Sequence, residues 1–125
     1  MSETDARVIN ETEWDLLEVL WERERATARD VAGALTDSRG WAYSTVKTLL
    51  DRMVGKGLVS ARRVGNVWEY EPAVDAVDAQ RSAWKRFVRA AFSDSLEPAL
   101  RFIAEDARLT KRQRAKLRAL LEDPS

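Results

Sequence analysis

A chain of 125 residues is long enough for one compact domain, or for a small domain with a short oligomerisation module, but too short for a large catalytic domain. Its 21 basic and 21 acidic residues balance, and it has neither cysteine nor histidine, which excludes disulfides, thiolate chemistry and any imidazole-based site. No apolar run matches a membrane span and the N-terminus lacks a signal-peptide core, so we expect a cytoplasmic protein without membrane insertion. Without cysteine or histidine, we also expect no metal and no cofactor.

Three short helices are predicted in the first half of the chain. Asn10 with Glu13, and Thr27 with Asp30, match the capping boxes that begin many helices. A third helix is expected over residues 43–54, before two glycines stop it. The apolar residues expected to face the core at helical spacing are Trp14, Leu17, Leu20, Trp21, Ala28, Val31, Ala32, Leu35, Val46, Leu49, Leu50 and Met53.

After Gly57 the apolar spacing changes from helical to strand-like. Two strand candidates, residues 58–64 and 67–71, flank the dipeptide Gly65-Asn66, which favours a tight two-residue hairpin. Trp68 and Tyr70 then share one face of the second strand. Three helices followed by a hairpin predict a winged helix-turn-helix, in a fold that is mostly α with a small β-hairpin.

Three further helices are expected in the rest of the chain. Asp75 with Asp78 marks the start of the first, Pro98 is tolerated in the first turn of the second, and Thr110 with Gln113 opens the third. We therefore divide the chain into a winged helix-turn-helix domain, residues 1–73, and a helical module, residues 74–125.

About 50 residues are too few for a sound independent core, so the apolar stripes of this module need a partner. Because two-fold dimers are the commonest assemblies, we predict dimerisation, with packing back onto the winged domain as the alternative. The residues predicted to form the dimer are Trp84, Phe87, Val88, Phe92, Leu96, Leu100, Ile103, Leu117, Leu120 and Leu121.

Positive charge is concentrated around the third helix and the hairpin. Residues 38–66 contain six basic residues and one acid, a net charge of +5, which suits a nucleic-acid partner, although a solvated basic face is the ordinary alternative. With the apolar side of the third helix buried, we predict base contacts with double-stranded DNA from Ser44, Thr45, Lys47 and Thr48. Phosphate contacts are predicted from Tyr43, Arg52, Arg62, Arg63 and Asn66.

The sequence resembles the BlaI/MecI/CopY-type penicillinase repressors over nearly its whole length, from about residue 8 to 122. The motifs that carry the resemblance are Asn10-Glu11-Thr12-Glu13-Trp14 with Leu17 and Trp21, Thr45-Val46-Lys47-Thr48-Leu49-Leu50-Asp51-Arg52-Met53, Lys56-Gly57-Leu58, Tyr70-Glu71-Pro72 and Leu109-Thr110. The resemblance implies a sequence-specific repressor, related to regulators of penicillin and methicillin resistance, that occupies palindromic operators as a homodimer. It also implies a membrane-bound sensor metalloprotease as a partner, whose cleavage of the dimerisation helices relieves repression.

Three departures limit what the resemblance carries over. The implied cleavage position holds Arg101 and Phe102, where the best-known members have Asn and Phe, which argues against cleavage here. The absence of cysteine excludes the copper-binding tail of one branch. At the wing tip Asn66 stands where a basic residue often follows the glycine, which should weaken one phosphate contact.

Two other functions, catalysis and protein binding, compete with DNA binding as interpretations of the sequence. The adjacent carboxylate pairs Glu105-Asp106 and Glu122-Asp123 do not converge on a substrate, because neighbouring residues of a helix point about 100° apart, so we predict no enzyme. The alternative is a winged-helix module that binds proteins and not DNA. A protein-binding helix would more often expose apolar anchors than the polar face expected here.

Overall fold

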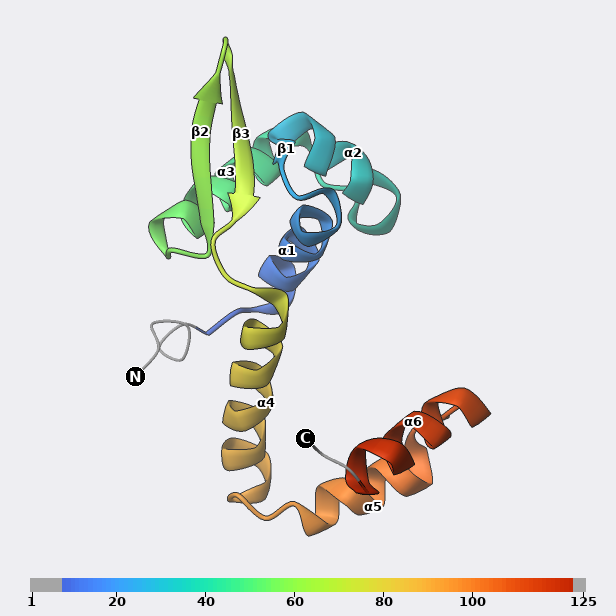
Figure 1. The fold of residues 1–125 in the computed structure, drawn as a ribbon. Coiled ribbons are helices and arrows are strands. Elements are labelled where there is room, and N and C mark those ends of the chain that lie inside the picture. The colour runs from blue at the N-terminus through green and yellow to red at the C-terminus, as the bar shows by residue number, and fades with distance from the viewer. Residues whose placement is uncertain (1–7, 123–125) are drawn as a thin grey trace. The chain divides into compact units, whose positions relative to one another are not determined.

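The computed structural model describes residues 8–122. These form two compact units, an N-terminal unit that ends at Lys85 and a C-terminal unit that begins at Arg86, and the boundary falls within one helix. The elements in chain order are α1 (Glu11–Arg23), β1 (Ala26–Thr27), α2 (Ala28–Arg39), α3 (Tyr43–Gly55), β2 (Val59–Val64), β3 (Val67–Pro72), α4 (Ala76–Phe92), α5 (Glu97–Asp106) and α6 (Lys111–Glu122) (Figure 1). The predicted fold class is confirmed.

The helices of the N-terminal unit begin at the predicted caps. The backbone N–H of Glu13 donates to Asn10 Oδ1 at 2.8 Å, and the Glu13 carboxylate accepts from the Asn10 N–H at 3.0 Å. Thr27 and Asp30 make the same reciprocal pair at 3.1 Å. Each box satisfies two of the backbone donors that a helix leaves open at its start, so the short segments begin at defined residues.

The sheet has three strands, whereas the sequence predicted a hairpin alone. The two-residue strand β1 pairs antiparallel with β3, placing Ala26 opposite Tyr70, and gives the order β1-β3-β2. A strand of two residues, the second of which is also the cap of α2, shows no period-2 pattern, and its hydrogen-bond partner is a strand some 40 residues later. The pairing ties the start of α2 to the wing.

The hairpin of β2 and β3 is the predicted wing, and it extends past the helices of the N-terminal unit (Figure 1). Val64 pairs with Val67 across a two-residue turn. Gly65 has φ of 64°, whereas Asn66 is not among the residues with positive φ. Glycine at the first central position is typical of a type II′ turn, which matches the twist of the flanking strands.

The core of the N-terminal unit lies between its helices and the inner face of the sheet. Leu16, Leu17 and Leu20 of α1 meet the buried faces of α2 and α3 and the ring of Tyr70, which is 1% exposed. Trp14 and Trp21 pack half-buried at its edge. The core also includes Val74 and Ala79, which lie beyond the division at residue 73, and Trp21 Nε1 donates to the Val74 carbonyl at 3.0 Å.

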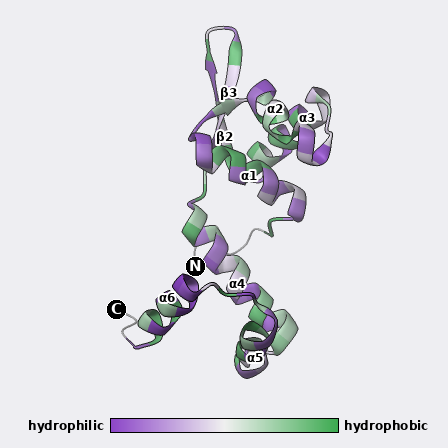
Figure 2. Ribbon diagram, turned by 90° about the vertical axis from the view of Figure 1, so that its right-hand side faces the viewer, coloured by the Kyte–Doolittle hydropathy of each residue, from purple (hydrophilic) through white to green (hydrophobic). Residues whose placement is uncertain are grey.

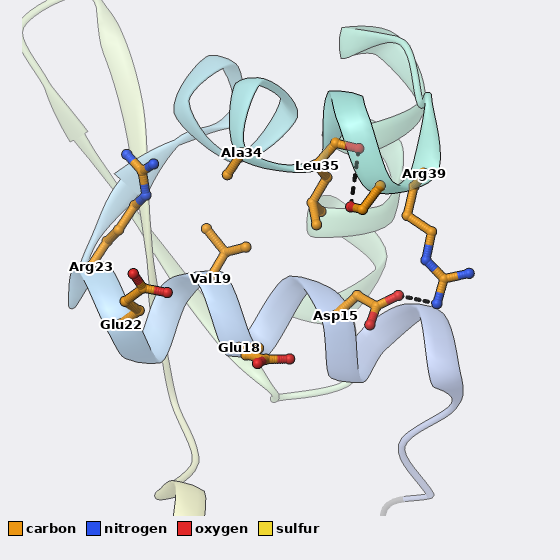
Figure 3. Close-up of a pocket in the computed structure, with 9 residues that line it drawn as sticks. Asp15, Glu18, Val19, Glu22, Arg23, Ala34, Leu35 and Arg39 are labelled. Atoms are coloured by element: carbon orange, nitrogen blue, oxygen red, sulfur yellow. Dashed lines mark hydrogen bonds and ion pairs between the residues drawn. The ribbon is translucent and has the colours of Figure 1, made fainter.

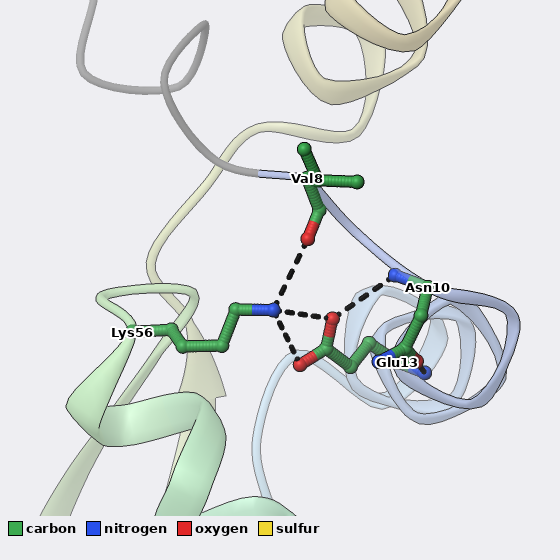
Figure 4. A network of polar contacts seen from close by, with 4 residues as sticks. All are labelled: Val8, Asn10, Glu13 and Lys56. Atoms are coloured by element: carbon green, nitrogen blue, oxygen red, sulfur yellow. Dashed lines mark hydrogen bonds and ion pairs between the residues drawn. The ribbon is translucent and has the colours of Figure 1, made fainter.

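A buried carboxylate joins the first and third helices. Glu13 is only 5% exposed, and both of its carboxylate oxygens lie 2.8 Å from Lys56 Nζ, at the end of α3. The same ammonium donates to the Val8 carbonyl at 3.1 Å, and Glu13 still completes the cap of Asn10 (Figure 4). Because a buried charge needs a partner, this pair fixes how α1 meets the end of α3.

Lys56→Met is therefore expected to lower the free energy of unfolding by about 1 to 3 kcal/mol, since it leaves the Glu13 carboxylate buried without its cation. Urea unfolding at fixed protein concentration measures the change. The control is Lys85→Met at an exposed position of α4, where we expect a change within about 0.5 kcal/mol. Equal effects of the two variants would contradict the role assigned to Lys56.

The C-terminal unit contains the end of α4 and the helices α5 and α6. Thr110 and Gln113 cap α6 reciprocally at 2.9 and 3.0 Å, and Pro98 lies in the first turn of α5, both as predicted. Within the described part of this unit only Val88 and Ala99 are buried, and both lie in α4 or α5; α6 buries no residue. Among residues 8–122 no helix is both long and apolar enough to cross a membrane.

Candidate nucleic-acid interface

The exposed side of α3 divides into two surfaces. Its buried side consists of Val46, Leu50 and Met53, which sets the opposite side toward solvent. Four of the predicted DNA-contacting residues lie together around a shallow hollow of about 270 Å³, which Leu49 completes. These residues, which we call the recognition surface, are Ser44, Thr45, Thr48 and Arg52. The short hydroxyls let this surface approach the edges of bases without steric conflict.

Lys47 lies apart from the recognition surface, on the side of α3 that faces the wing. Its ammonium is 2.7 and 2.9 Å from the two carboxylate oxygens of Asp51, one turn later, and 5.6 Å from the centre of the Tyr70 ring. The Tyr70 hydroxyl donates to Asp51 Oδ1 at 2.8 Å. Three residues of α3 and β3 thus form one polar group, which we call the Lys47–Asp51–Tyr70 cluster.

The hydrogen bonds of this cluster favour the charged forms of both Lys47 and Asp51. The hydrogen bond with Asp51, followed by the contact with Tyr70, raises the pKa of Lys47 above its ordinary value. Burial acts to raise the pKa of Asp51, but the hydrogen bonds from Lys47 and Tyr70 outweigh it, and the net shift is downward. Burial raises the pKa of Tyr70, so its hydroxyl stays protonated as a donor. At neutral pH the cluster is therefore an ion pair with a phenol bound to it.

A second hollow, of about 170 Å³, lies between the starts of α2 and α3 and the wing. It brings together the predicted residues Tyr43, Lys47 and Asn66 with Arg29 and Trp68. The Arg29 guanidinium stacks over the Tyr43 ring at 4.6 Å from its centre. Sequence reasoning missed Arg29, because it lies outside the basic stretch 38–66 and only the fold places it beside Tyr43.

The two wing arginines lie on opposite faces of the sheet. Arg63 is opposite Trp68 and Arg62 is opposite Glu69 in the strand register, and neighbouring residues of a strand point to opposite faces. Arg62 lies 3.8 Å from the Glu69 carboxylate, and Arg63 Nε donates to the Gly65 carbonyl at 3.3 Å. Both side chains are exposed, and neither lines the two hollows beside α3.

Another groove, of about 630 Å³, runs between α1 and α2, away from the recognition surface (Figure 3). Three acids line it, Asp15, Glu18 and Glu22, and Arg39 forms an ion pair with Asp15. Within residues 8–122 no group of three or more acids could hold a metal ion. With Arg23 and Arg39 also in the lining, the groove carries no excess of positive charge that would attract a nucleic-acid backbone.

The residues predicted for dimerisation are mostly exposed in the single chain. Figure 2 shows hydrophobic residues along α4, α5 and α6. Val88 is buried, Phe92 is half-buried between the rings of Phe87 and Phe102, and the other eight are at least 36% exposed: Trp84, Phe87, Leu96, Leu100, Ile103, Leu117, Leu120 and Leu121. The residues at the implied cleavage position, Arg101 and Phe102, lie exposed within the helical backbone of α5.

Three helices, a wing and an open polar face on the third helix define a winged helix-turn-helix of the DNA-binding class. The sequence profile described as Penicillinase repressor matches residues 9–123. The chain therefore belongs to the penicillinase repressor family, whose members are DNA-binding transcriptional repressors and not enzymes. The resemblance stated from the motifs is confirmed.

Individual relatives agree with this assignment. The penicillinase repressor of Bacillus licheniformis is 23% identical over 92% of this chain and 90% of its own, and the methicillin resistance regulatory protein MecI of Mammaliicoccus sciuri is 21% identical over 90% and 92%. An uncharacterised 16.5 kDa protein of Latilactobacillus sakei is 31% identical over 60% of this chain, which spans only about half, 51%, of that relative.

Solved structures agree on the fold. BlaI of Bacillus licheniformis, in its monomeric form in complex with the blaP half-operator, is 26% identical, with a TM-score of 0.51 over 58% of this chain and 88% of its own. The oxidised form of MarR from E. coli has a TM-score of 0.52 at 15% identity, over 96% of this chain and 78% of its own. The similarity to MarR concerns the fold alone.

Proposed function

We propose that this repressor binds short palindromic operators as a homodimer, with α3 in the major groove and the wing beside the adjacent backbone. The observation that carries the proposal is the recognition surface of α3, which is polar and open, on a helix whose adjacent side meets the wing. The likeness to BlaI, which was solved on a half-operator, supports the same use of the fold. A fold of this class reads one half-site with each recognition helix.

The contacts divide by chemistry. We assign base contacts to Ser44, Thr45 and Thr48 in the groove and to Lys47 from the side of the wing, because hydroxyls and an ammonium match base-edge acceptors and donors. Backbone contacts are assigned to residues of α3 and of the wing, namely Tyr43, Arg52, Arg62, Arg63 and Asn66.

The homodimer is proposed from the C-terminal unit. Its described residues bury only two side chains, whereas its exposed leucines and phenylalanines offer apolar surface that a second copy would remove from water. A sensor metalloprotease remains an implication of the resemblance. A cut at Arg101 and Phe102 would require α5 to unwind, since proteases act on extended chain and both residues lie inside the helix.

Binding is tested by titrating a duplex from the region upstream of the gene, against a scrambled duplex, at several salt concentrations. Thr48→Ala is expected to weaken operator binding by about 1 kcal/mol and to relax preference at one base pair. Arg63→Ala is expected to weaken binding to both duplexes and to reduce the salt slope by about 1.

Arg89→Ala, an exposed arginine of α4, is the control and should leave both affinities unchanged. If the wild-type chain shows no preference for the operator at low salt, DNA reading by α3 is wrong and a protein-interaction module is the better interpretation. If Thr48→Ala and Arg63→Ala each lower the affinity for the operator and the affinity for the scrambled duplex by the same factor, the division into base and backbone contacts is wrong.

A further inference from the structure

An acidic side chain borders the recognition surface that the proposed function turns toward DNA. Asp51 follows Thr48 by three positions and Lys47 by one turn, so it lies between the recognition surface and the side of α3 that faces the wing. It is the one acid within residues 38–66. A carboxylate facing a polyanion is unfavourable unless it does something for binding.

What Asp51 does in the structure is hold Lys47. Both carboxylate oxygens accept from the Lys47 ammonium, at 2.7 and 2.9 Å, and the Tyr70 hydroxyl holds one of them from the wing at 2.8 Å. Of the three N–H donors of the ammonium, up to two point to the Asp51 carboxylate, and Tyr70 lies beside the same group. The carboxylate thus orients a cation that would otherwise be mobile.

Whether Lys47 is paired or unpaired affects how well the protein distinguishes its operator from other DNA. An unpaired lysine on a long flexible stem contacts any phosphate within reach, and each such contact strengthens binding to all sequences alike. A lysine that is paired with a carboxylate gains less binding free energy from phosphates. An N–H of the oriented ammonium can still donate to a base acceptor, such as guanine O6 or N7, if the correct base lies opposite.

We propose that Asp51 is a specificity-determining residue that acts through Lys47. By pairing with Lys47 and Tyr70 it fixes the ammonium beside the wing and suppresses its sequence-independent attraction to phosphates. The inference rests on the proposed DNA binding by α3. Asp51 is a positioning residue in this account and makes no base contact of its own.

The test compares wild-type protein with Asp51→Asn on operator and scrambled duplexes between 50 and 200 mM salt. The substitution keeps the shape of the side chain and releases the charge of Lys47. Affinity for the scrambled duplex is expected to rise roughly three- to tenfold at low salt, with a slope steeper by about 0.9, the value of one added phosphate contact. Operator affinity should rise less or fall, so the ratio of operator affinity to scrambled-duplex affinity should decrease.

Two further variants separate the mechanism from its alternatives. In the Lys47→Met background, Asp51→Asn should no longer steepen the salt slope, because no ammonium is left to release. Tyr70→Phe keeps the ion pair, so its slope should stay close to that of the wild type. Thermal unfolding by circular dichroism establishes that each variant is folded before its binding is compared.

The proposal is overturned if Asp51→Asn leaves the affinity ratio and the salt slope unchanged in folded protein. It is also overturned if the loss of preference persists without Lys47, since Asp51 would then read a base directly, for instance by accepting from cytosine N4. Absence of operator preference in the wild type would instead refute the proposed function. The three outcomes are distinguishable in one set of titrations.

Discussion

A chain that ends at Lys85 is expected to fold, to be monomeric and to bind operator DNA about 10² to 10⁴ times more weakly than the full chain. The N-terminal unit contains the whole core around Tyr70, including Val74 and Ala79, so removal of residues 86–125 leaves it complete. The loss comes from avidity, because two linked heads bind a palindrome with a high effective concentration and a single head does not. Sedimentation and titration of a full operator measure the two effects.

A substitution in the full chain tests the same interface without truncation. Leu120→Glu places a charge on the apolar side of α6, where Leu120 is 51% exposed, and should give a monomer with similarly weak operator binding. Ala115→Glu introduces the same charge at another exposed position of α6, away from its leucine stripe, and should remain dimeric. A monomeric wild-type chain, or a dimer that survives Leu120→Glu, would remove α6 from this role.

Leu50→Ala is expected to lower the free energy of unfolding by about 2 to 5 kcal/mol, the largest effect on stability that we predict for one side chain. Leu50 is fully buried beneath the recognition surface, where it joins α3 to the core of the N-terminal unit. Its truncation removes apolar contacts and leaves a cavity that a close-packed core fills only in part. Because whole domains are stable by only about 5 to 15 kcal/mol, a loss of this size should lower the folded fraction and weaken operator binding near physiological temperature.

Chemical unfolding at fixed protein concentration measures the effect. Leu50→Met nearly conserves volume and should cost less than about 1.5 kcal/mol. Leu121→Ala, at a residue that is 70% exposed in the single chain, controls for the loss of the same atoms outside this core. If Leu50→Ala cost no more than Leu50→Met, the close packing assigned to the underside of α3 would be wrong.

Local structure was predictable wherever the cause is local. The capping boxes at Asn10 and Thr27 and the Gly65-Asn66 turn use residues three or fewer positions apart, so the sequence contains the whole interaction. Apolar spacing identified the buried sides of α2 and α3 for the same reason. These features led directly to the winged helix-turn-helix and to the recognition surface of α3.

Pairings between distant segments were not predictable, and they determine how the site is arranged. The strand β1 exists only because β3 is present to pair with it, and Glu13 meets Lys56 across 43 positions of sequence. The sequence predicted that Lys47 contacts bases, but it did not predict the partners of Lys47, which are Asp51 one turn later and Tyr70 of the wing.

The sequence by itself thus determined the order of elements, the family and the polar face of α3, because each depends on periodicity and short-range motifs. The tertiary structure decided which of those polar groups are free and which neutralise one another. That division requires the wing to lie against α3, a contact between residues 19 positions apart that no local pattern contains.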